Sequence, residues 1–502
     1  MLSLLCVLAV VSGEVENETE RPNVLFIAVD DLRVQLGCYG QPVETPHIDR
    51  LAAAGCRFER AYCQQTVCNP SRASVLTGLR PDTLGVYDLH THFREKRPKV
   101  QTLPQRFKAD GYHTRCIGKV FHNWVQPNRR GDKPSWSVPS VLHYAHHGDD
   151  VPHVGWMPLD TAGISRTERR DVPDDAYFDG RVAKLASETL AAYGQHAADA
   201  PQETIEPFFL AVGFWKPHAP FNAPERYWQP YDERPDAIAP LAATDRPEGV
   251  PDLAMHAGLE INRGFRDRPG KRPTDADARM LRHGYAAAIS YLDAQVGRVL
   301  AALEASGLRE RTLVVFWSDH GYHLGEQSLW AKTSVFELDA RVPLLIAAPG
   351  QPAGVVVETP VELLDLYPTL CELAAVKLPP GLEGRSLVPL LDGSQSAVAA
   401  FAEAKPVAMT QHPRPAYLGP GEEPTEMGRS VTDGRYRFTR WQKHNAGDPA
   451  AGATLAVELY DHEADPGESR NLADDPDAAS TIDRLTRRLD ALVGTQTQPT
   501  RD

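Results

Sequence analysis

Four apolar runs along the chain predict strands that are buried on both faces. The first, 23–29 (NVLFIAV), is rich in β-branched residues and lies between Pro22 and Asp30. Three runs of the same kind follow it, at 208–214, 312–317 and 341–348. Continuous apolar strands of this kind are typical of a parallel sheet whose two faces are both covered.

Helical patterns separate these runs. Residues 286–303 repeat apolar positions at helical spacing, and Thr45 followed by Pro46 is suited to cap and begin a helix over 46–54. Strands that alternate with helices predict an α/β fold with a mixed, mostly parallel sheet flanked by helices. In such sheets ligands bind at the carboxyl ends of the strands.

The pattern changes after Leu391-Asp392-Gly393. Four short strand-like segments joined by turns follow, at 406–411, 428–432, 436–441 and 457–460. A helical pattern over 478–492 ends the series, and together these elements predict a smaller antiparallel-sheet subdomain. The predicted organisation is therefore a leader over 1–20, a catalytic domain over 21–396 and a C-terminal subdomain over 397–502.

Composition narrows the function classes. The 502 residues carry a formal net charge of −14, which is the opposite of the balance expected of a nucleic-acid binder. An anionic substrate would therefore need a local cluster of cations or a metal. The apolar run 1–13, which ends in small residues, predicts a signal peptide, with a buried N-terminal strand as the alternative. We therefore expect a secreted or periplasmic protein, lysosomal in a eukaryote, with no membrane span.

The seven cysteines are scattered, without the paired spacing of a zinc site or a disulfide framework. Most are predicted to be small buried residues. Cys68 is the exception, because it opens the stretch 68–78 (CNPSRASVLTG). Pro70 suits the first turn of a helix, which would place Cys68 at the positive end of the helix dipole, at a site that faces solvent. A structural cysteine at a buried helix start is the alternative.

Carboxylates follow two of the predicted strands. Asp30 and Asp31 come directly after the first run, and Asp319 and His320 follow the run that ends at 317. Three carboxylates with one imidazole favour a hard divalent cation, and calcium is the predicted ion. A helix cap and a turn are the alternatives for the two pairs. Both pairs lie at strand ends that are expected to meet, which favours the metal site.

Two other segments carry candidate polar residues. The stretch 111–122 (GYHTRCIGKVFH) contains Lys119 and His122, which taken alone would be surface residues. The segment 122–175 is rich in Pro, Gly, His and Arg and predicts a long surface insertion. Its dense cluster of histidines and aspartates over 143–153 is interpreted as a solvated loop, with substrate contact or zinc as alternatives.

The stretch 68–78 resembles the signature of the formylglycine-dependent sulfatase family, in which C-x-P-x-R followed by L-T-G directs oxidation of the cysteine to formylglycine. The segment 111–122 is similar to the family's second signature. The resemblance implies an alkaline-phosphatase-like fold and maturation by a formylglycine-generating enzyme. It also implies one calcium ion. The implied calcium ligands are Asp30, Asp31, the modified Cys68, Asp319 and His320.

Within the family, motifs such as Lys216-Pro217-His218, Ser318-Asp319-His320-Gly321 and Trp330-Ala331-Lys332 are most similar to those of iduronate-2-sulfatases. The resemblance covers about 21–472. It implies that His218 and Lys332 contact the sulfate and assist the leaving oxygen, and that Lys119 and Arg72 add positive charge. It also implies that His122 drives sulfate release.

The implied substrate is a sulfated carbohydrate, with the 2-O-sulfate of a terminal uronic acid in glycosaminoglycans as the specific candidate. His323 and the segment 327–329 are expected to face substrate and depart from the relatives' pattern. Three alternatives stay open: a sulfatase for another sulfated polysaccharide, a phosphodiesterase or phosphonate monoester hydrolase of the same superfamily, and a sugar-binding protein that has lost catalysis.

Overall fold

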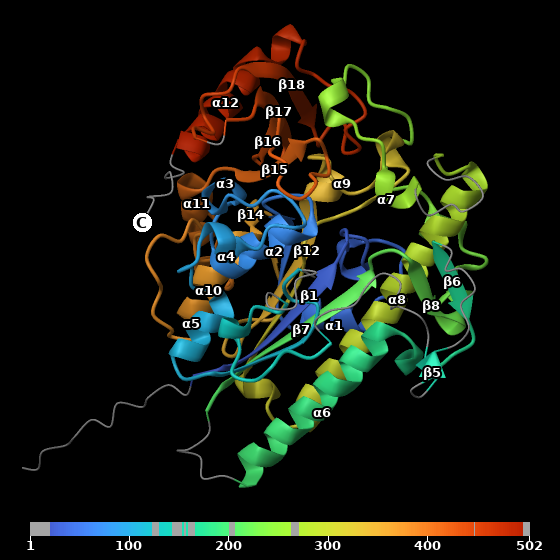
Figure 1. The fold of residues 1–502 in the computed structure, drawn as a ribbon, viewed down its shortest axis with the longest axis vertical. Helices are drawn as coiled ribbons and strands as arrows, with labels where there is room; N and C mark the ends of the chain where they lie inside the picture. Colours follow the sequence, from blue (N-terminus) through green and yellow to red (C-terminus); the bar gives the residue numbers. More distant parts are fainter. Residues whose placement is uncertain are drawn as a thin grey trace, which may run out of the picture.

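The computed structural model describes residues 21–122, 130–142, 153–154, 157–158, 166–199, 206–262, 271–445 and 447–494. Its centre is an eight-stranded sheet in the order β13-β2-β12-β9-β1-β7-β3, with β14 also paired to β2 (Figure 1). The strands are β1 (Asn23–Asp30), β2 (Cys56–Tyr62), β3 (His113–Gly118), β7 (Phe208–Pro217), β9 (Thr312–Ser318), β12 (Arg341–Ala347), β13 (Val355–Val357) and β14 (Val361–Glu362).

Most pairs in this sheet are parallel. β1 lies between β7 and β9 and is parallel to both, and β3 is parallel to β7. The exception is β12, which runs antiparallel to β9 and to β2. The four predicted buried strands are therefore confirmed, and the sheet is mixed and mostly parallel, as expected.

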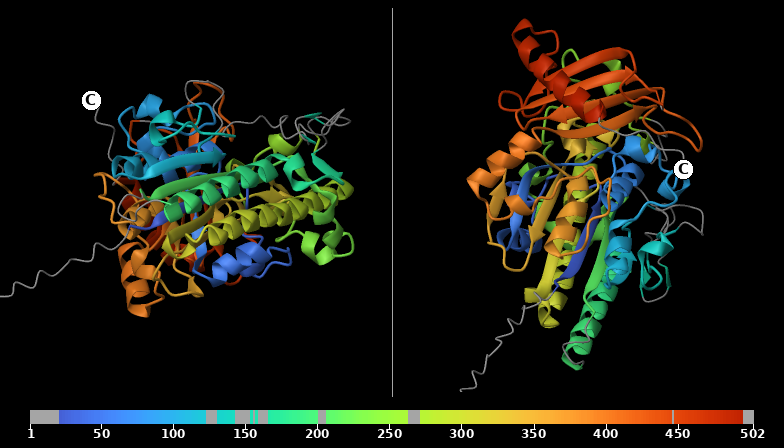
Figure 2. Two further views of the ribbon diagram at one scale, coloured as in Figure 1. Left: turned by 90° about the horizontal axis from the view of Figure 1, so that it is seen from below. Right: turned by 90° about the vertical axis from the view of Figure 1, so that its left-hand side faces the viewer.

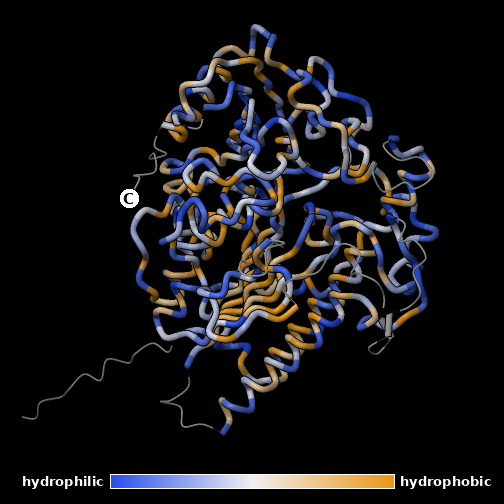
Figure 3. The backbone as a smooth tube through the Cα atoms, viewed as in Figure 1, coloured by the Kyte–Doolittle hydropathy of each residue, from blue (hydrophilic) through white to orange (hydrophobic). Residues whose placement is uncertain are grey.

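Helices cover both faces because side chains along β1 alternate between two apolar cores. Leu25, Ile27 and Val29 pack with residues of α1 (Pro46–Ala53), α6 (Phe178–Asp199) and α8 (Asp275–Ala305). Val24, Phe26 and Ala28 pack with α2 (Cys68–Thr77), α5 (Leu103–Ala109) and α10 (Leu366–Leu373). The long helices α6 and α8 lie side by side across one face (Figure 2), and the strands between the two layers are the most hydrophobic part of the chain (Figure 3).

A four-stranded antiparallel sheet forms the C-terminal part and lies at one end of the molecule (Figure 1). Its strands are β15 (Ala408–Arg414), β16 (Glu426–Thr432), β17 (Tyr436–Lys443) and β18 (Thr454–Asp461), and α12 (Ala479–Gly494) packs on it. The antiparallel sheet and its helix are thus confirmed. The expected boundary between 396 and 397 falls inside α11 (Gln395–Ala404), whose Phe401 belongs to the larger core, and the domain division stays a prediction.

The remaining elements are short. The helices are α3 (Pro81–Leu84), α4 (Phe93–Lys96), α7 (Leu259–Asn262) and α9 (Glu337–Ala340). The strands are β4 (His153–Val154), β5 (Met157–Pro158), β6 (Thr167–Arg170), β8 (Phe221–Pro224), β10 (His323–Leu324) and β11 (Trp330–Ala331). Within the described ranges, no helix combines the length and hydropathy that a bilayer span requires. The predicted leader, 1–20, lies outside the described residues.

Candidate active site

The two acidic pairs meet at the carboxyl end of the sheet. β1 pairs with β9 so that Val29 is opposite Ser318, and the residues that follow both strands therefore emerge side by side. The backbone N–H of Asp31 donates to Asp319 Oδ1 at 3.1 Å, and His320 Nε2 lies 3.3 Å from Asp31 Oδ1. Residues almost 290 positions apart thus form one buried cluster, as predicted.

The backbone at Asp31 turns sharply to bring both carboxylates to the same place. Asp31 has a φ of 61°, a left-handed conformation that is uncommon outside glycine and occurs at functional sites. The turn is held by the Leu32 N–H, which donates to Ser318 Oγ at 2.9 Å, and by Tyr285, whose hydroxyl donates to the Asp31 carbonyl at 2.7 Å. Without the turn, successive side chains of the strand would point to opposite faces of the sheet.

Cys68 is the first residue of α2, directly beneath this cluster. Its Sγ lies 3.3 Å from His320 Nε2 and within 4.8 Å of donor atoms of Asp30, Asp31 and His218. The helix start is confirmed, but the expectation of a solvent-facing site is wrong, because Cys68 is only 2% exposed and every residue of α2 is buried. Burial, followed by the charge of Asp30, raises the pKa of the Cys68 thiol well above its ordinary value. An unmodified thiol there would be a weak nucleophile at neutral pH.

Arg72 lies one helical turn after Cys68, and every N–H group of its guanidinium is hydrogen-bonded within the protein. Nε donates to Asp319 Oδ2 at 2.8 Å, and Nη2 donates to Asp30 Oδ1 at 3.1 Å. The remaining N–H groups donate to the carbonyls of Val29, Lys119 and Val120. Arg72 therefore orients two carboxylates of the cluster and has no N–H group left to contact a substrate directly.

Two lysines contact this cluster, one at Asp30 and the other at Asp31. Lys119, which follows β3, donates to Asp30 Oδ2 and lies 5.1 Å from the centre of the Trp215 ring. Lys332, which follows β11, donates to both oxygens of Asp31 at 2.8 and 2.9 Å. Both lysines are almost fully buried, and the neighbouring carboxylates raise the pKa of each although burial opposes this. Both side chains are thus held as cations beside Cys68.

The two predicted histidines also lie at this site. His218 Nε2 is 3.7 Å from Asp31 Oδ2, and its Nδ1 is 2.6 Å from the Ala219 carbonyl, so Nδ1 carries the proton and Nε2 faces the cluster. The pKa of His122 is lowered well below its ordinary value by burial and by the charge of Lys119. Lys216, in the same short motif as His218, instead donates to the carbonyls of His218 and Pro220 and shapes the turn.

The donor set fits a hard cation. His320 Nδ1 is 2.9 Å from the Gly321 carbonyl, and burial lowers the pKa of His320, so the lone pair of Nε2 faces the carboxylate of Asp31. Burial, opposed by Lys332 but assisted by Asp30, raises the pKa of Asp31 well above its usual range. A divalent cation would offset the repulsion between the Nε2 lone pair of His320 and the carboxylate of Asp31, and also the repulsion between the neighbouring carboxylates. Most of the donors are oxygen atoms, which suits calcium.

Three further residues at this site were not predicted from the sequence. Glu260, in α7, lies 3.3 Å from Lys332 Nζ, and its carboxylate accepts hydrogen bonds from the hydroxyls of Tyr417 at 3.1 Å and Tyr322 at 3.4 Å. They come from three separate parts of the chain and share no motif. They are identified only by their contacts in the folded structure.

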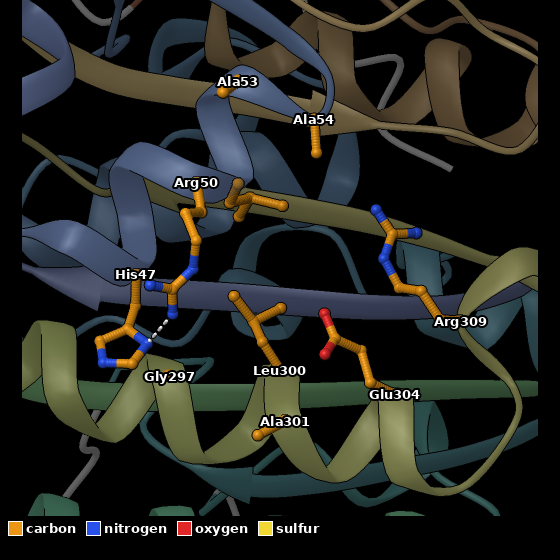
Figure 4. A pocket seen from close by; sticks show the side chains of 10 residues that line it. His47, Arg50, Ala53, Ala54, Gly297, Leu300, Ala301, Glu304 and Arg309 are labelled. Atoms are coloured by element: carbon orange, nitrogen blue, oxygen red, sulfur yellow. Dashed lines mark hydrogen bonds between the residues drawn. The ribbon is translucent and has the colours of Figure 1, made fainter.

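The remaining candidates from the sequence have different outcomes. His323 and Gln327 are buried, and their side chains are hydrogen-bonded to each other; that they face substrate stays a prediction. The histidine and aspartate cluster of 143–153 lies outside the residues whose side chains are described. A cavity of about 470 Å³ between α1 and α8, lined by Arg50, Glu304 and Arg309 (Figure 4), contains none of the predicted site residues.

Comparison with known proteins agrees with this geometry. The family model described as "Sulfatase" matches residues 22–376, and the model "N-sulphoglucosamine sulphohydrolase, C-terminal" matches 325–495. Human iduronate 2-sulfatase is 33% identical over 95% of both chains.

Among solved structures, a 2-O GAG sulfatase superposes with a TM-score of 0.67 at 23% identity, covering 95% of this chain and 93% of that one. The phosphonate monoester hydrolase of Agrobacterium radiobacter superposes with a TM-score of 0.72 at 24% identity, covering 95% and 96%. These two likenesses show the shared alkaline-phosphatase-like fold.

The matched model spans most of the chain, a relative above 30% identity matches it almost end to end, and the strand ends gather a buried aspartate, cysteine and histidine cluster. The chain belongs to the sulfatase family and is an enzyme that hydrolyses sulfate esters.

Proposed function

We propose that this enzyme removes a 2-O-sulfate from a terminal uronic acid of a glycosaminoglycan, with formylglycine made from Cys68 as its nucleophile. The chemistry is supported by the position of Cys68 Sγ at the start of α2. It lies 3.3 Å from His320 Nε2 and within 4.8 Å of oxygens of three carboxylates. Burial and the charge of Asp30 raise the pKa of the thiol and favour its protonated form, which supports a different nucleophile at this position.

Calcium would be held by Asp30, Asp31, Asp319 and His320 together with the modified side chain at position 68. When bound, it would polarise the sulfate oxygens and offset the negative charge that develops on them. The formylglycine, as its hydrate, would supply one hydroxyl that attacks sulfur and a second whose deprotonation expels sulfate. A formylglycine-generating enzyme is the partner that this maturation requires.

The side chains around Cys68 divide the remaining work. Lys119 and Lys332 are cations on two sides of the site and would stabilise the charged sulfate. His218 presents Nε2 to the cluster and would, with Lys332, assist the departing sugar oxygen. His122 would take a proton when sulfate is released. Arg72 acts indirectly, by fixing the carboxylates of Asp30 and Asp319.

The substrate assignment draws on similarity. The chain is 33% identical to human iduronate 2-sulfatase over nearly its whole length, and it shares the fold of a 2-O GAG sulfatase. A sugar that carries both a sulfate and a carboxylate needs several cations in a confined site, and Lys119 and Lys332 supply positive charge there despite the net charge of −14.

Peptide mass spectrometry of the active protein tests the nucleophile. We expect the peptide containing position 68 to have oxygen in place of sulfur and to react with a carbonyl reagent. Cys68→Ala should fold with normal cooperativity and lose all measurable sulfatase activity, while Cys371→Ala, a matched buried cysteine, should stay active. An active preparation in which Cys68 is wholly unmodified would contradict the proposed mechanism.

Assays on defined substrates test the specificity. A panel should contain terminally 2-O-sulfated uronic acid oligosaccharides, sulfated hexoses, aryl sulfates and phosphate diesters. We expect the highest kcat/KM on the 2-O-sulfated uronic acids. Activity confined to sulfated hexoses, or a preference for phosphate diesters, would overturn the substrate assignment and leave the nucleophile unaffected.

A further inference from the structure

The loop that carries Lys332 has an unusual backbone. Gln327, Ser328, Ala331 and Thr333 all have positive φ values, between 55° and 87°, although none of them is glycine. Such conformations persist only where surrounding contacts hold them. The groups that hold this loop therefore also fix the position of Lys332.

His323 lies at the centre of those contacts. It is fully buried and sits opposite Ala331 in the short β10–β11 hairpin, one residue before Lys332. Its Nδ1 is 2.6 Å from Asp339 Oδ1 and its Nε2 is 2.6 Å from Gln327 Oε1. Both ring nitrogens thus face oxygen atoms.

The neighbours of His323 fix its protonation. Gln327 Nε2 donates to the Gly467 carbonyl at 3.0 Å, which leaves Gln327 Oε1 to accept a hydrogen bond from His323. The ring therefore donates from both nitrogens, as an imidazolium. Although burial opposes it, the Asp339 carboxylate raises the pKa of His323, in agreement with this geometry.

The far side of Asp339 completes the connection. Its Oδ2 accepts hydrogen bonds from the backbone N–H of Ser334 at 2.9 Å and from Ser334 Oγ at 2.7 Å. Ser334 is two residues after Lys332. A continuous chain of hydrogen bonds therefore runs from Gly467, in the C-terminal part, through Gln327, His323 and Asp339 to Ser334, on the C-terminal side of Lys332. On the N-terminal side, His323 is the strand partner of Ala331.

We propose that His323 is a positioning residue for Lys332, and that through it the C-terminal part of the chain sets the reach of that lysine to the leaving oxygen. The inference rests on the proposed role of Lys332 in the reaction. Lys332 is held at Asp31 by its own ion pair, and the backbone around it is linked to His323 through Asp339 and Ser334 on one side and through the strand partner Ala331 on the other. A displacement of about 1 Å at such a group can cost on the order of 100-fold in rate.

The test is the dependence of His323→Gln on the leaving group. A glutamine has donors on one nitrogen only, so it cannot place one donor where each ring nitrogen of His323 lies. For a series of aryl sulfates, we expect kcat/KM to fall ~30-fold with the least acidic phenol and only ~3-fold with 4-nitrophenol, because a poor leaving group depends most on a positioned donor. Each preparation is normalised to its formylglycine content.

A matched control separates positioning from lost stability. Leu303→Ala, at a fully buried position near the end of α8, should lower the melting temperature without any dependence on the phenol. In a Lys332→Ala background, His323→Gln should change kcat by less than ~2-fold, because the two substitutions then remove one function. An additive loss in that background, or a loss equal across all phenols, would overturn the proposal.

A second variant covers the case in which His323→Gln does not fold. Gln327→Met keeps the His323–Asp339 pair but removes the link to Gly467, and it should give a smaller loss with the same dependence on the phenol. If Gln327→Met behaves like Leu303→Ala, the proposal fails. If Lys332→Ala or Cys68→Ala leaves activity unchanged, the proposed function itself fails, and the two outcomes are thereby distinguished.

Discussion

At the scale of single residues, Arg72 shows that a motif can identify a residue without defining what that residue contacts. Arg72 is part of the motif, and the resemblance implies that it adds positive charge at the site. In the structure the guanidinium is 0% exposed and donates to Asp30, Asp319 and three carbonyls. A planar fork with five donors can hold two carboxylates at fixed angles, which a lysine cannot do. Arg72 thus orders the carboxylates of Asp30 and Asp319.

Arg72→Lys keeps the charge and tests that geometry. We expect kcat/KM to fall ~100-fold, because the carboxylates lose their fixed orientation. Urea denaturation should show a free energy of unfolding lower by about 2 kcal/mol, because buried acceptors lose their donors. The fraction of modified Cys68 must be measured in parallel, since the motif also directs maturation. A variant with normal kcat per modified molecule would show that the fork is dispensable.

Asp319→Ala tests the metal at the same scale. Wild-type protein should gain about 2.7 kcal/mol of stability when free calcium is raised to 100 times its dissociation constant, because only the folded state binds the ion. Asp319→Ala should lose both this gain and the activity. Asp365→Asn, which alters a buried carboxylate paired with Lys405, should keep the calcium response. Full activity of the wild type after exhaustive chelation would rule out the metal assignment.

At the scale of elements, the site depends on how the segments that follow β1 and β9 are tied together. Arg33, just past β1, donates to Glu326 Oε1 at 2.9 Å, and both side chains are buried. Glu326 also accepts from the backbone of Leu241 and Leu324. Burial alone would raise the pKa of Glu326, but Arg33 lowers it from 4.5 to about 2. The ionised pair thus braces the loop that leads to Lys332.

This pair predicts a specific pH dependence of stability. Because the folded pKa of Glu326 is below its ordinary value, the stabilisation is complete above pH 4.5 and is lost as the pH falls toward 2. The difference in unfolding free energy between wild type and Glu326→Gln should therefore shrink from pH 5 to pH 3, by at most about 1.4 kcal/mol per pH unit. Glu310→Gln, at an exposed position, should show no such trend. A constant difference would contradict the assigned ionisation.

At the scale of the whole molecule, the C-terminal sheet helps to build the site. Arg414, at the end of β15, donates to the Thr333 carbonyl at 3.1 Å and stacks over Trp441 at 4.6 Å. Tyr417 reaches Glu260 beside Lys332, and Gly467 accepts from Gln327. The loop around Lys332 is therefore supported by both parts of the chain, and changes in the smaller sheet should affect catalysis.

The overall charge bears on how a polyanionic substrate is approached. A net charge of −14 disfavours drawing a long polyanion across the surface, while the cations beside Cys68 are confined to a buried site. We therefore expect exo action, with short, terminally 2-O-sulfated uronic acid oligosaccharides hydrolysed faster than the intact polymer. Sulfate release measured against chain length checks this. Equal rates on internal and terminal sulfates would contradict it.

The sequence by itself determined the parts of the protein that depend on local order. Buried strands, the helix start at Cys68 and the acidic strand ends can be predicted because periodicity, β-branching and motif spacing act over a few residues. β1 and β9 could be predicted to share an edge because parallel strands in such folds end together. These elements and their chemistry followed without coordinates.

Only the tertiary structure decided what depends on packing between distant segments. It buried Cys68, turned Arg72 toward carboxylates, made β12 antiparallel and placed Glu260 and Tyr417 beside Lys332. It also paired His323 with Asp339 and Gln327. Such contacts arise from long-range pairing and side-chain direction, which carry no periodic signal along the chain. Residues that support the site without belonging to a motif are therefore identified only from the structure.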